Sequence, residues 1–247
     1  MGGITSYASL GERTYQEDRH LVINKDFASL LAVMDGHGGD ETSDFCFQNL
    51  ERIFERVLSK NKSFSGAIVK DLISELDQET KGHTSGSTIS IVLISEFEEN
   101  AHVGVLGDSP VVIKDKNGKV NISPEHNVRS NLKEKEEAKK RGGVYQGGYM
   151  YQPNGKYGLQ LSRALGDYKM GEVISHEPEV YAVELGKDSF ILVGSDGLFD
   201  PSHDDTGGQI KVLVKKINEG AEAENLVQDA LDRGIRDNVT AILCRVY

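Results

Sequence analysis

Aspartates that adjoin short β-rich runs are the residues of this sequence most able to do chemistry. They are Asp35 after residues 30–34, Asp108 after residues 103–107, Asp196 after residues 190–195, and Asp237 just before residues 241–246. Acids at strand ends lie where a sheet opens to solvent, so several strands can direct carboxylates into one cleft. Carboxylates gathered there without partners would be costly, so the arrangement calls for bound cations.

Two further motifs add polar groups to these acids. Arg-Thr-Tyr-Gln-Glu-Asp at 13–18 offers a cation and two adjacent acids, which alone would fit an ordinary surface salt-bridge cluster. Asp-Gly-His-Gly-Gly-Asp at 35–40 is more specific, because glycines on both sides of the histidine let the backbone turn tightly. Such a turn brings the Asp35 carboxylate and the Gly36 carbonyl toward one ion.

Hydrophobic spacing predicts the elements that must position these motifs. Strands are predicted at 3–9, 30–34, 89–94, 103–107, 190–193 and 241–246, and helices at 40–57, 68–76, 210–217 and 226–231. Strands dominate the middle of the chain, with one helix pair before them and one after. That order predicts an α+β fold, a four-layer α/β/β/α sandwich of two packed, mainly antiparallel sheets flanked by helix pairs. We expect a single domain over residues 1–247.

Three local features are also predicted. Asp40 can cap the N-terminus of the first helix. Residues 133–141 are charge-dense, with Glu136–Lys140 and Glu137–Arg141 at i,i+4 spacing, which is typical of a solvated surface helix. Residues 144–158 are rich in Gly, Tyr and Asn, and we expect a flexible, variable flap at about 144–160 beside the site.

Five more motifs complete a series that runs along the chain. They are Ser-Gly-Ser-Thr at 85–88, Gly-Asp-Ser at 107–109, Leu-Ser-Arg-Ala-Leu-Gly-Asp at 161–167, Ser-Asp-Gly-Leu-Phe-Asp at 195–200 and Arg-Asp-Asn-Val-Thr at 236–240. Taken in order, the motifs resemble those of the metal-dependent protein phosphatase family, protein phosphatase 2C, over residues 3–246. The resemblance implies an α/β/β/α sandwich with metal ions in a cleft at one end, in agreement with the fold predicted from spacing.

The resemblance implies two Mg²⁺ or Mn²⁺ ions, which the oxygen donors of carboxylates, carbonyls and water favour. The implied ligands are Asp35 bridging both ions, Asp196 and Asp237 completing one ion, and Glu17 with the Gly36 carbonyl serving the other. Asp108 and Asp200, together with Asp196, match the positions of a weaker third metal ion in some family members.

Catalytic roles are implied in the same way. Asp18 would orient metal-bound water, Arg13 would clamp the substrate phosphate with its guanidinium fork, and His37 would protonate the leaving oxygen. A hydroxide held between the two ions would attack phosphorus in line, without a phosphoenzyme. Histidine at position 37 resembles the eukaryotic-style branch, which favours phosphoserine and phosphothreonine proteins as substrates.

Other polar residues are left outside the predicted site. Asp167 is interpreted as a helix or turn cap, and Ser162 and Arg163 as supports of the fold. Residues 201–205 depart from the family pattern, so the start of the following helix is expected to differ. The remaining histidines show no paired spacing for zinc and are interpreted as surface or core residues; they are His20, His83, His102, His126, His176 and His203.

Composition limits the partners. The formal charge is −11, from 39 acids and 28 bases, which argues against nucleic-acid binding. No apolar stretch approaches the length of a membrane span. The first six residues fit the spacing for N-myristoylation, but a lipid would compete with the strand predicted at 3–9, so membrane association is not expected. We expect a monomer in the cytoplasm or the nucleus.

Two alternatives to an active phosphatase were weighed. A pseudophosphatase that keeps the fold as a binding module should lack primary ligands, whereas this sequence retains every one of them together with Arg13 and His37. A different two-metal hydrolase, such as a phosphodiesterase, would mix histidines among the carboxylates, and the predicted ligand set contains none.

Overall fold

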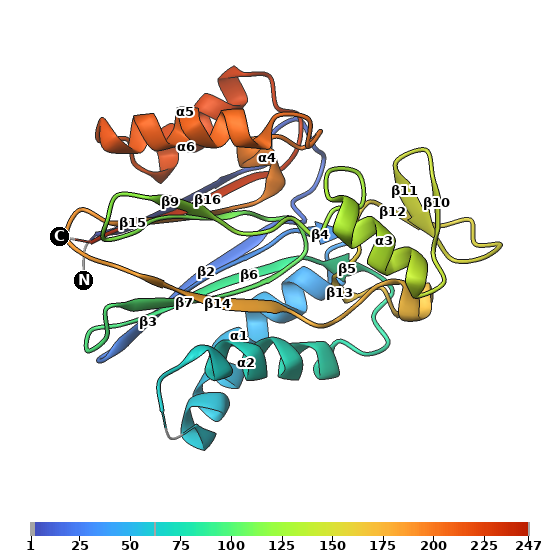
Figure 1. Cartoon of the computed structure of the whole chain (residues 1–247), viewed down its shortest axis with the longest axis horizontal. Helices are drawn as coiled ribbons and strands as arrows, with labels where there is room; N and C mark the ends of the chain where they lie inside the picture. Colours follow the sequence, from blue (N-terminus) through green and yellow to red (C-terminus); the bar gives the residue numbers. More distant parts are fainter. Residues whose placement is uncertain (1–2, 62, 247) are drawn as a thin grey trace.

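Two five-stranded antiparallel sheets form the centre of the computed structural model, which describes residues 3–61 and 63–246 (Figure 1). Sheet I has the order β1 (Ile4–Ser9), β16 (Val239–Arg245), β15 (Phe190–Gly194), β8 (Val111–Lys114) and β9 (Val120–Ile122). Sheet II has the order β14 (Glu179–Glu184), β7 (Asn100–Leu106), β6 (Ile89–Ser95), β3 (Ala28–Met34) and β2 (Arg19–Lys25).

Helix pairs cover the outer faces of the two sheets. Helices α1 (Glu41–Lys60) and α2 (Gly66–Glu79) lie on sheet II, and α5 (Thr206–Asn218) and α6 (Ala223–Asp232) lie on sheet I, as Figure 1 shows. The predicted four-layer α/β/β/α sandwich is therefore confirmed. No helix within the described part of the chain is both long and apolar enough to cross a bilayer.

Burial on both faces explains why the central strands are apolar at consecutive positions. Successive side chains of a strand point to opposite faces. Leu30 and Ala32 of β3 accordingly join the core under α1 and α2, whereas Leu31 and Val33 join the core between the sheets. Sheet I follows the same rule, because Leu243 of β16 packs toward α5 and α6. Strands buried on both faces are stiff, which suits them to holding acids at their ends.

Smaller elements gather at the end of the sandwich where β3, β7 and β15 finish (Figure 1). They are β4 (Gly36–His37), β5 (Gly86–Ser87), α3 (Leu132–Lys140), β10 (Val144–Gln146), β11 (Tyr149–Tyr151), β12 (Gly158–Leu159), β13 (Leu165–Gly166), the 3₁₀ helix η1 (Tyr168–Val173) and the single turn α4 (Asp196–Phe199). Strands β13, β5 and β4 form one small sheet and β10, β11 and β12 another.

The segment predicted as a flap is more regular than its composition suggested. Residues 144–159 contain all three strands of the second small sheet. Met150 of β11 is fully buried in a local cluster with Ala138 of α3 and Met170 of η1. This apolar anchor ties one side of the flap to the elements beside the cleft, which a Gly- and Tyr-rich composition does not reveal.

Two local predictions place the helix correctly, and the structure differs from them only in the side-chain contacts. Asp40 occupies the N-cap position of α1, but its side chain makes no capping hydrogen bond and pairs instead with Arg19 at 3.2 Å. In α3, Lys139 and Lys140 pair with Glu136 and Glu137 at i,i+3 spacing rather than i,i+4. The two glutamates take nearer lysines one turn away, which leaves Arg141 free to bind backbone carbonyls.

Candidate metal centre and active site

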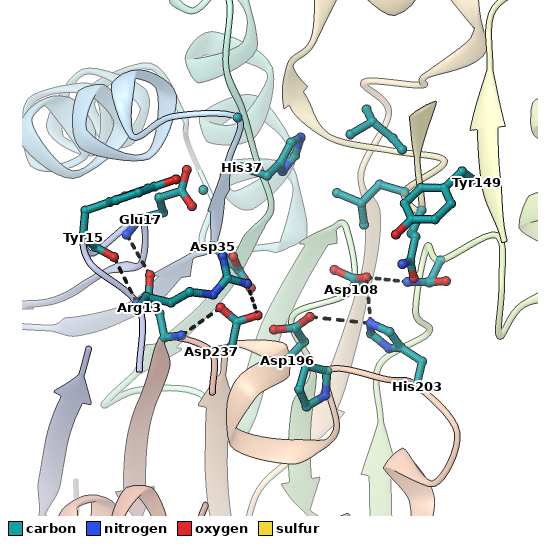
Figure 2. A pocket seen from close by; sticks show the side chains of 18 residues that line it. Arg13, Tyr15, Glu17, Asp35, His37, Asp108, Tyr149, Asp196, His203 and Asp237 are labelled. Atoms are coloured by element: carbon teal, nitrogen blue, oxygen red, sulfur yellow. Dashed lines mark hydrogen bonds and ion pairs between the residues drawn. The ribbon is translucent and has the colours of Figure 1, made fainter. Parts of the chain in front are cut away.

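A cavity of about 510 Å³ opens at the end of the sandwich where the small elements gather (Figure 2). Its wall carries most of the residues that the sequence singled out: Arg13, Glu17, Asp35, Gly36, His37, Asp108, Asp196 and Asp237. Asp18 lies directly behind this wall and is buried. Acids from five separate places in the chain therefore meet in one cleft, as the strand-end pattern predicted.

Asp35 lies at the centre of this group. Its backbone is locked beside β5, since its N–H donates to Thr88 Oγ1 at 3.0 Å and its carbonyl accepts from the Thr88 N–H at 2.9 Å. Burial, followed by repulsion from nearby carboxylates beginning with Asp18 and Asp196, holds the pKa of Asp35 well above its usual range. Such a carboxyl lacks a positive partner, which is the electrostatic signature of a cation site.

The pKa values of Asp18 and Asp196 are also raised. Burial raises the pKa of Asp18 to about 7, although a 2.7 Å hydrogen bond from Thr240 Oγ1 works against that rise. Burial also raises the pKa of Asp196, with Asp108 and Asp237 adding repulsion and His203 opposing it. Both groups would be stabilised as anions by a divalent ion in the cleft.

The turn after Asp35 needs glycine for close packing against Glu17, which lies in the segment just before β2. A Cβ at Gly36 would lie 2.6 Å from Ser43 Oγ and 2.8 Å from the Glu17 carbonyl oxygen. The Gly36 N–H donates to that same carbonyl at 3.2 Å, and Glu17 Oε1 accepts from the Gly39 N–H at 2.8 Å. Glu17 and the Gly36 backbone are thus fixed side by side, as their predicted service to one ion requires.

Arg13, which is predicted to bind the substrate phosphate, contacts Asp237 in this structure. Its guanidinium donates to Asp237 Oδ2 at 2.6 Å, and its side chain is 48% exposed. Asp237 Oδ1 accepts from the Asn238 N–H at 2.8 Å, while the Asn238 side chain accepts from the Glu17 N–H at 2.8 Å. Among the described residues that line the cavity, Arg13 is the only arginine or lysine, and it neutralises Asp237 from the solvent side.

His37 is held by an acid that the sequence interpretation left out. Its Nε2 contacts Asp167 Oδ2, and the Asp167 side chain is fully buried. Asp167 occupies the N-cap position of η1 but makes no side-chain capping bond, so its interpretation as a cap is wrong. A Cβ at Gly86 would collide with both partners, so glycine there lets the pair form. Asp167 follows the short strand β13, and the strand-then-acid pattern could have identified it.

The predicted third metal group is not assembled as expected. The Asp200 carboxylate turns into its own loop, where Oδ1 accepts from the Ser202 N–H at 2.9 Å and Oδ2 accepts from the Asp205 N–H at 2.6 Å. His203 takes the position beside Asp108 and Asp196 instead, and one donor atom from each of the three lies within 4.8 Å of the others. The predicted role of Asp200 stays a prediction, and the sequence analysis left His203 outside the site.

The charges around His203 are unusual (Figure 2). Burial alone would lower its pKa, but the carboxylates of Asp108, Asp196 and Glu125, at 3.2, 3.6 and 3.4 Å, raise the pKa to about 12. Asp108 is also buried, and His203 together with an Asn127 amide at 2.8 Å lowers its pKa despite that burial. The only sequence signal for this contact was the irregular stretch at 201–205.

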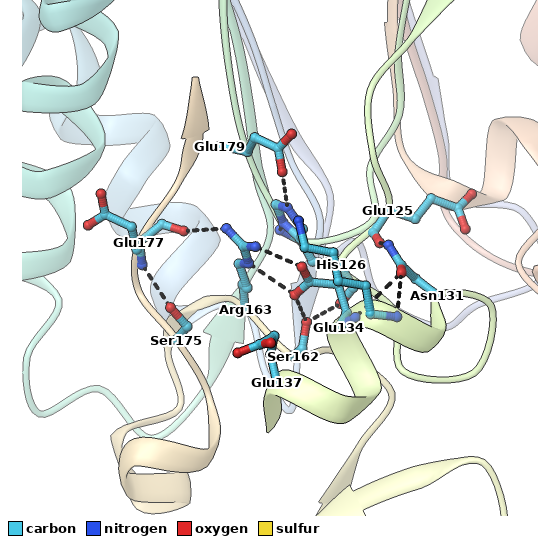
Figure 3. A network of polar contacts seen from close by, with 12 residues as sticks. Glu125, His126, Asn131, Glu134, Glu137, Ser162, Arg163, Ser175, Glu177 and Glu179 are labelled. Atoms are coloured by element: carbon cyan, nitrogen blue, oxygen red, sulfur yellow. Dashed lines mark hydrogen bonds and ion pairs between the residues drawn. The ribbon is translucent and has the colours of Figure 1, made fainter. Parts of the chain in front are cut away.

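A buried polar network fixes the wall that carries Asp108 (Figure 3). Glu134 of α3 accepts from Arg163 at 2.7 and 3.0 Å and from Ser162 Oγ at 2.6 Å. His126 Nδ1 accepts from the Gly107 N–H at 3.1 Å, one residue before Asp108. Ser162 and Arg163 therefore support the fold, as the sequence predicted, and they do so by anchoring α3 beside the cleft.

Comparison with known proteins shows which family this chain belongs to. The family model described as "Protein phosphatase 2C" matches residues 6–239. The chain belongs to the protein phosphatase 2C family. It is accordingly a protein phosphatase, and the metal dependence of that family agrees with the acidic cleft.

Similar proteins come from distant organisms. "Protein phosphatase 1L" of Bos taurus is 28% identical over 98% of this chain and 72% of its own length. "Probable protein phosphatase 2C 2" of Paramecium tetraurelia is 31% identical over 94% of this chain and 88% of its own length. Among solved structures, "Structure of a C.elegans sex determining protein" superposes with a TM-score of 0.82 at 26% identity, covering 99% of this chain and 64% of that one.

The residues of the cleft fit hard divalent ions. The donors around Asp35 are carboxylate and carbonyl oxygens, the set that Mg²⁺ and Mn²⁺ prefer, and their crowding leaves negative charge to be neutralised. Around Asp108 the donor set is different, because the His203 ring lies beside Asp108 and Asp196 while the Asp200 carboxylate is bound within its own loop.

The crowding of carboxylates around Asp35 predicts that a substitution there changes the free energy of unfolding. Asp35→Asn should stabilise the metal-free protein by about 1–3 kcal/mol, because it removes a buried charge that has no positive partner. Urea unfolding in EDTA measures this, with exposed Asp232→Asn on α6 as the control that should leave stability unchanged. With Mn²⁺ added, the order should reverse, since the wild type gains more from the metal. A metal-free Asp35→Asn protein that is less stable than the wild type would contradict the account.

Proposed function

We propose that this chain hydrolyses phosphoserine and phosphothreonine in proteins, using a pair of Mg²⁺ or Mn²⁺ ions in the cleft. The observation that carries the proposal is Asp35, which is half-buried among four other carboxylates, with Arg13 and His37 on the same wall. A binding module would have no need to keep an arrangement that opposes folding.

The metal ligands would be the oxygens that the family resemblance implies. Asp196 and Asp237 would hold one ion, Glu17 and the Gly36 carbonyl the other, and Asp35 would be shared; all five residues line the same cleft. When bound, the ions supply an attacking hydroxide near neutral pH and neutralise the negative charge of the phosphate.

Arg13 would bind the substrate phosphate. Its side chain is half exposed at the mouth of the cleft and contacts Asp237, so it needs only to rotate outward to present its fork. A guanidinium pairs bidentately with two phosphate oxygens, which a lysine ammonium does less well. Asp18, held from behind by Thr240, would accept a hydrogen bond from water in the cleft and orient it.

His37 would deliver the proton that the departing serine or threonine oxygen needs. Its Nε2 is bound to Asp167, so Nδ1 is the ring nitrogen that can face the leaving group. Asp167 acts through His37 as a positioning residue, because a carboxylate on one ring nitrogen fixes the orientation of the other.

Phosphate release from a phosphothreonine peptide tests the proposal directly. Wild type should turn over with Mn²⁺ or Mg²⁺ and stop in EDTA, whereas Asp35→Ala and Asp237→Ala should lose at least about 10³-fold in kcat. Asp232→Ala, an exposed acid outside the cleft, serves as the matched control and should retain full activity. Turnover that survives both cleft substitutions would overturn the proposal. An inactive wild type across metals and peptides would favour a pseudophosphatase.

Leaving-group dependence tests His37 and Asp167 separately from the metals. His37→Gln should lower kcat by about 10²-fold or more on a phosphothreonine peptide, the usual contribution of a general acid. The same variant should lose less than about 10-fold on p-nitrophenyl phosphate, since its leaving group departs without a proton. Asp167→Asn should show the same pattern with a smaller loss. Equal losses on both substrates would show that these residues serve structure or binding rather than proton transfer.

A further inference from the structure

We propose that a groove on the flap binds the residues of the phosphoprotein substrate that flank the phosphorylated residue, and that it selects uncharged ones. The inference deepens the proposed function and rests on it, because the groove adjoins the cavity that carries the predicted metal ligands. It gives a role in substrate selection to Tyr149, which lies across the cavity from Arg13 (Figure 2).

The flap groove has a volume of about 550 Å³ and is formed by β10, β11 and the loop that follows β11. Its lining residues are Val144, Gln146, Gly147, Tyr149, Tyr151, Gln152, Asn154 and Gly155. Tyr149 also lines the cavity of about 510 Å³ that contains Asp35, so one side chain borders both spaces. A substrate chain that leaves the cavity over Tyr149 therefore enters the groove.

The alternation of side chains along β10 and β11 explains why one face of this small sheet is open. Cross-strand partners share a face of a sheet, and successive residues point to opposite faces. The pairs Val144–Tyr151 and Gln146–Tyr149 therefore lie together on the groove face. Met150, between the two tyrosines, is fully buried on the other face against α3 and η1. The buried face holds the flap in place, while Tyr149 remains 40% exposed.

The groove offers aromatic surfaces and neutral hydrogen-bonding groups. Tyr149 and Tyr151 supply rings that can pack against apolar or aromatic side chains, and hydroxyls that can form hydrogen bonds. The side-chain amides of Gln146, Gln152 and Asn154 can donate to a peptide backbone and accept from it. Antibodies bind protein surfaces with the same combination of rigid tyrosines and adaptable polar side chains. An extended, uncharged peptide segment is therefore the ligand that fits this groove.

The lining of the groove also disfavours charged ligands. No charged side chain is among its described lining residues, although charged residues make up 27% of the sequence. Arg129 approaches the turn at Gly148, but it is paired with Asp204 at 3.1 Å. A lysine or glutamate of the substrate would lose water in the groove without meeting an opposite charge. Charge thus selects the phosphate in the cavity, whereas shape and hydrogen bonds select the flanking residues.

The length of the strands sets how much of the substrate the groove can hold. Strands β10 and β11 have three residues each, so the groove face extends about 10 Å at about 3.4 Å per residue. About three extended residues of substrate can cross it. Because Tyr149 is the residue that borders both spaces, these three residues lie on one side of the phosphorylated residue.

Dephosphorylation of short phosphothreonine peptides by the full chain with Mn²⁺ tests the inference. The host peptide has alanines on both sides of phosphothreonine, and tyrosine, lysine or glutamate replaces three alanines before it or three after it. On one side, wild type should prefer tyrosine to both lysine and glutamate by about 10-fold in kcat/KM, the discrimination that a hydrophobic pocket commonly gives. On the other side, tyrosine should have no such advantage over both.

Substitutions connect this preference to the groove. Tyr149→Ala should abolish the preference for tyrosine, whereas Tyr149→Phe, which keeps the ring, should retain it. Gln146→Glu should raise kcat/KM for the lysine peptide relative to the glutamate peptide by about 3-fold, and Gln146→Lys should shift the ratio the opposite way. Gln78→Glu makes the same change at an exposed position of α2 and should leave the ratio unchanged.

The outcomes separate this inference from the function on which it rests. Equal kcat/KM for all peptides, or a preference that both Tyr149→Ala and Gln146→Glu leave unchanged, would overturn the role of the groove and leave the proposed function intact. A groove that binds a separate protein would give that same result. No turnover of any phosphopeptide by wild type would overturn the function and the inference together. Gln146 is exposed, so its variants test the groove even where Tyr149→Ala does not fold.

Discussion

Repulsion among buried carboxylates is the interaction on which the rest of this structure depends. Asp35 is enclosed at the end of the sandwich with Asp18, Asp196, Asp108 and Asp237, and its pKa is raised by burial and then by those neighbours. Bringing these acids together opposes folding, and only a rigid surround can hold them there. The two sheets provide that rigidity, because their central strands are buried on both faces and end at the cleft.

The residues around the cluster compensate the negative charge of each aspartate in a different way, and these differences separate the functions of the aspartates. Asp237 pairs with the half-exposed Arg13. Asp18 accepts a hydrogen bond from the Thr240 hydroxyl, and Asp108 contacts the imidazole of His203, which is almost fully buried. No ion pair with Asp35 is found among residues 3–61 and 63–246, and the four carboxylates near it raise its pKa. Partial compensation at the edges of the cluster would therefore direct divalent ions to Asp35.

Much of this site is predictable from local sequence. An apolar run that ends in an acid fixes both the strand and the direction of the carboxylate, so Asp35, Asp108 and Asp196 could be placed in one cleft before their contacts were known. Glycine beside Asp35 likewise predicts a tight turn, and the structure shows that Gly36 also lets this turn approach Glu17 closely. The sandwich and its helix pairs follow from the same periodicities.

The contacts that the sequence did not predict share a physical cause. They join residues far apart in the chain, or they depend on the conformation of a loop. His37 and Asp167 are 130 residues apart and meet only because β4, β5 and β13 form one small sheet. Asp200 and His203 are set by a turn with a positive φ, and no hydrophobic period reports how such a turn directs its side chains. Met150 shows the same limit for the flap, since one buried side chain orders a polar segment.

The central claim is that the cluster around Asp35 exists to hold a metal pair. Anomalous diffraction from crystals of the protein grown with Mn²⁺ tests it most directly, because it locates each ion independently of activity. The account predicts two anomalous peaks about 3.5–4 Å apart with Asp35 between them, one toward Asp237 and one toward Glu17. A cleft with no peak beside Asp35 in crystals saturated with Mn²⁺ would contradict it.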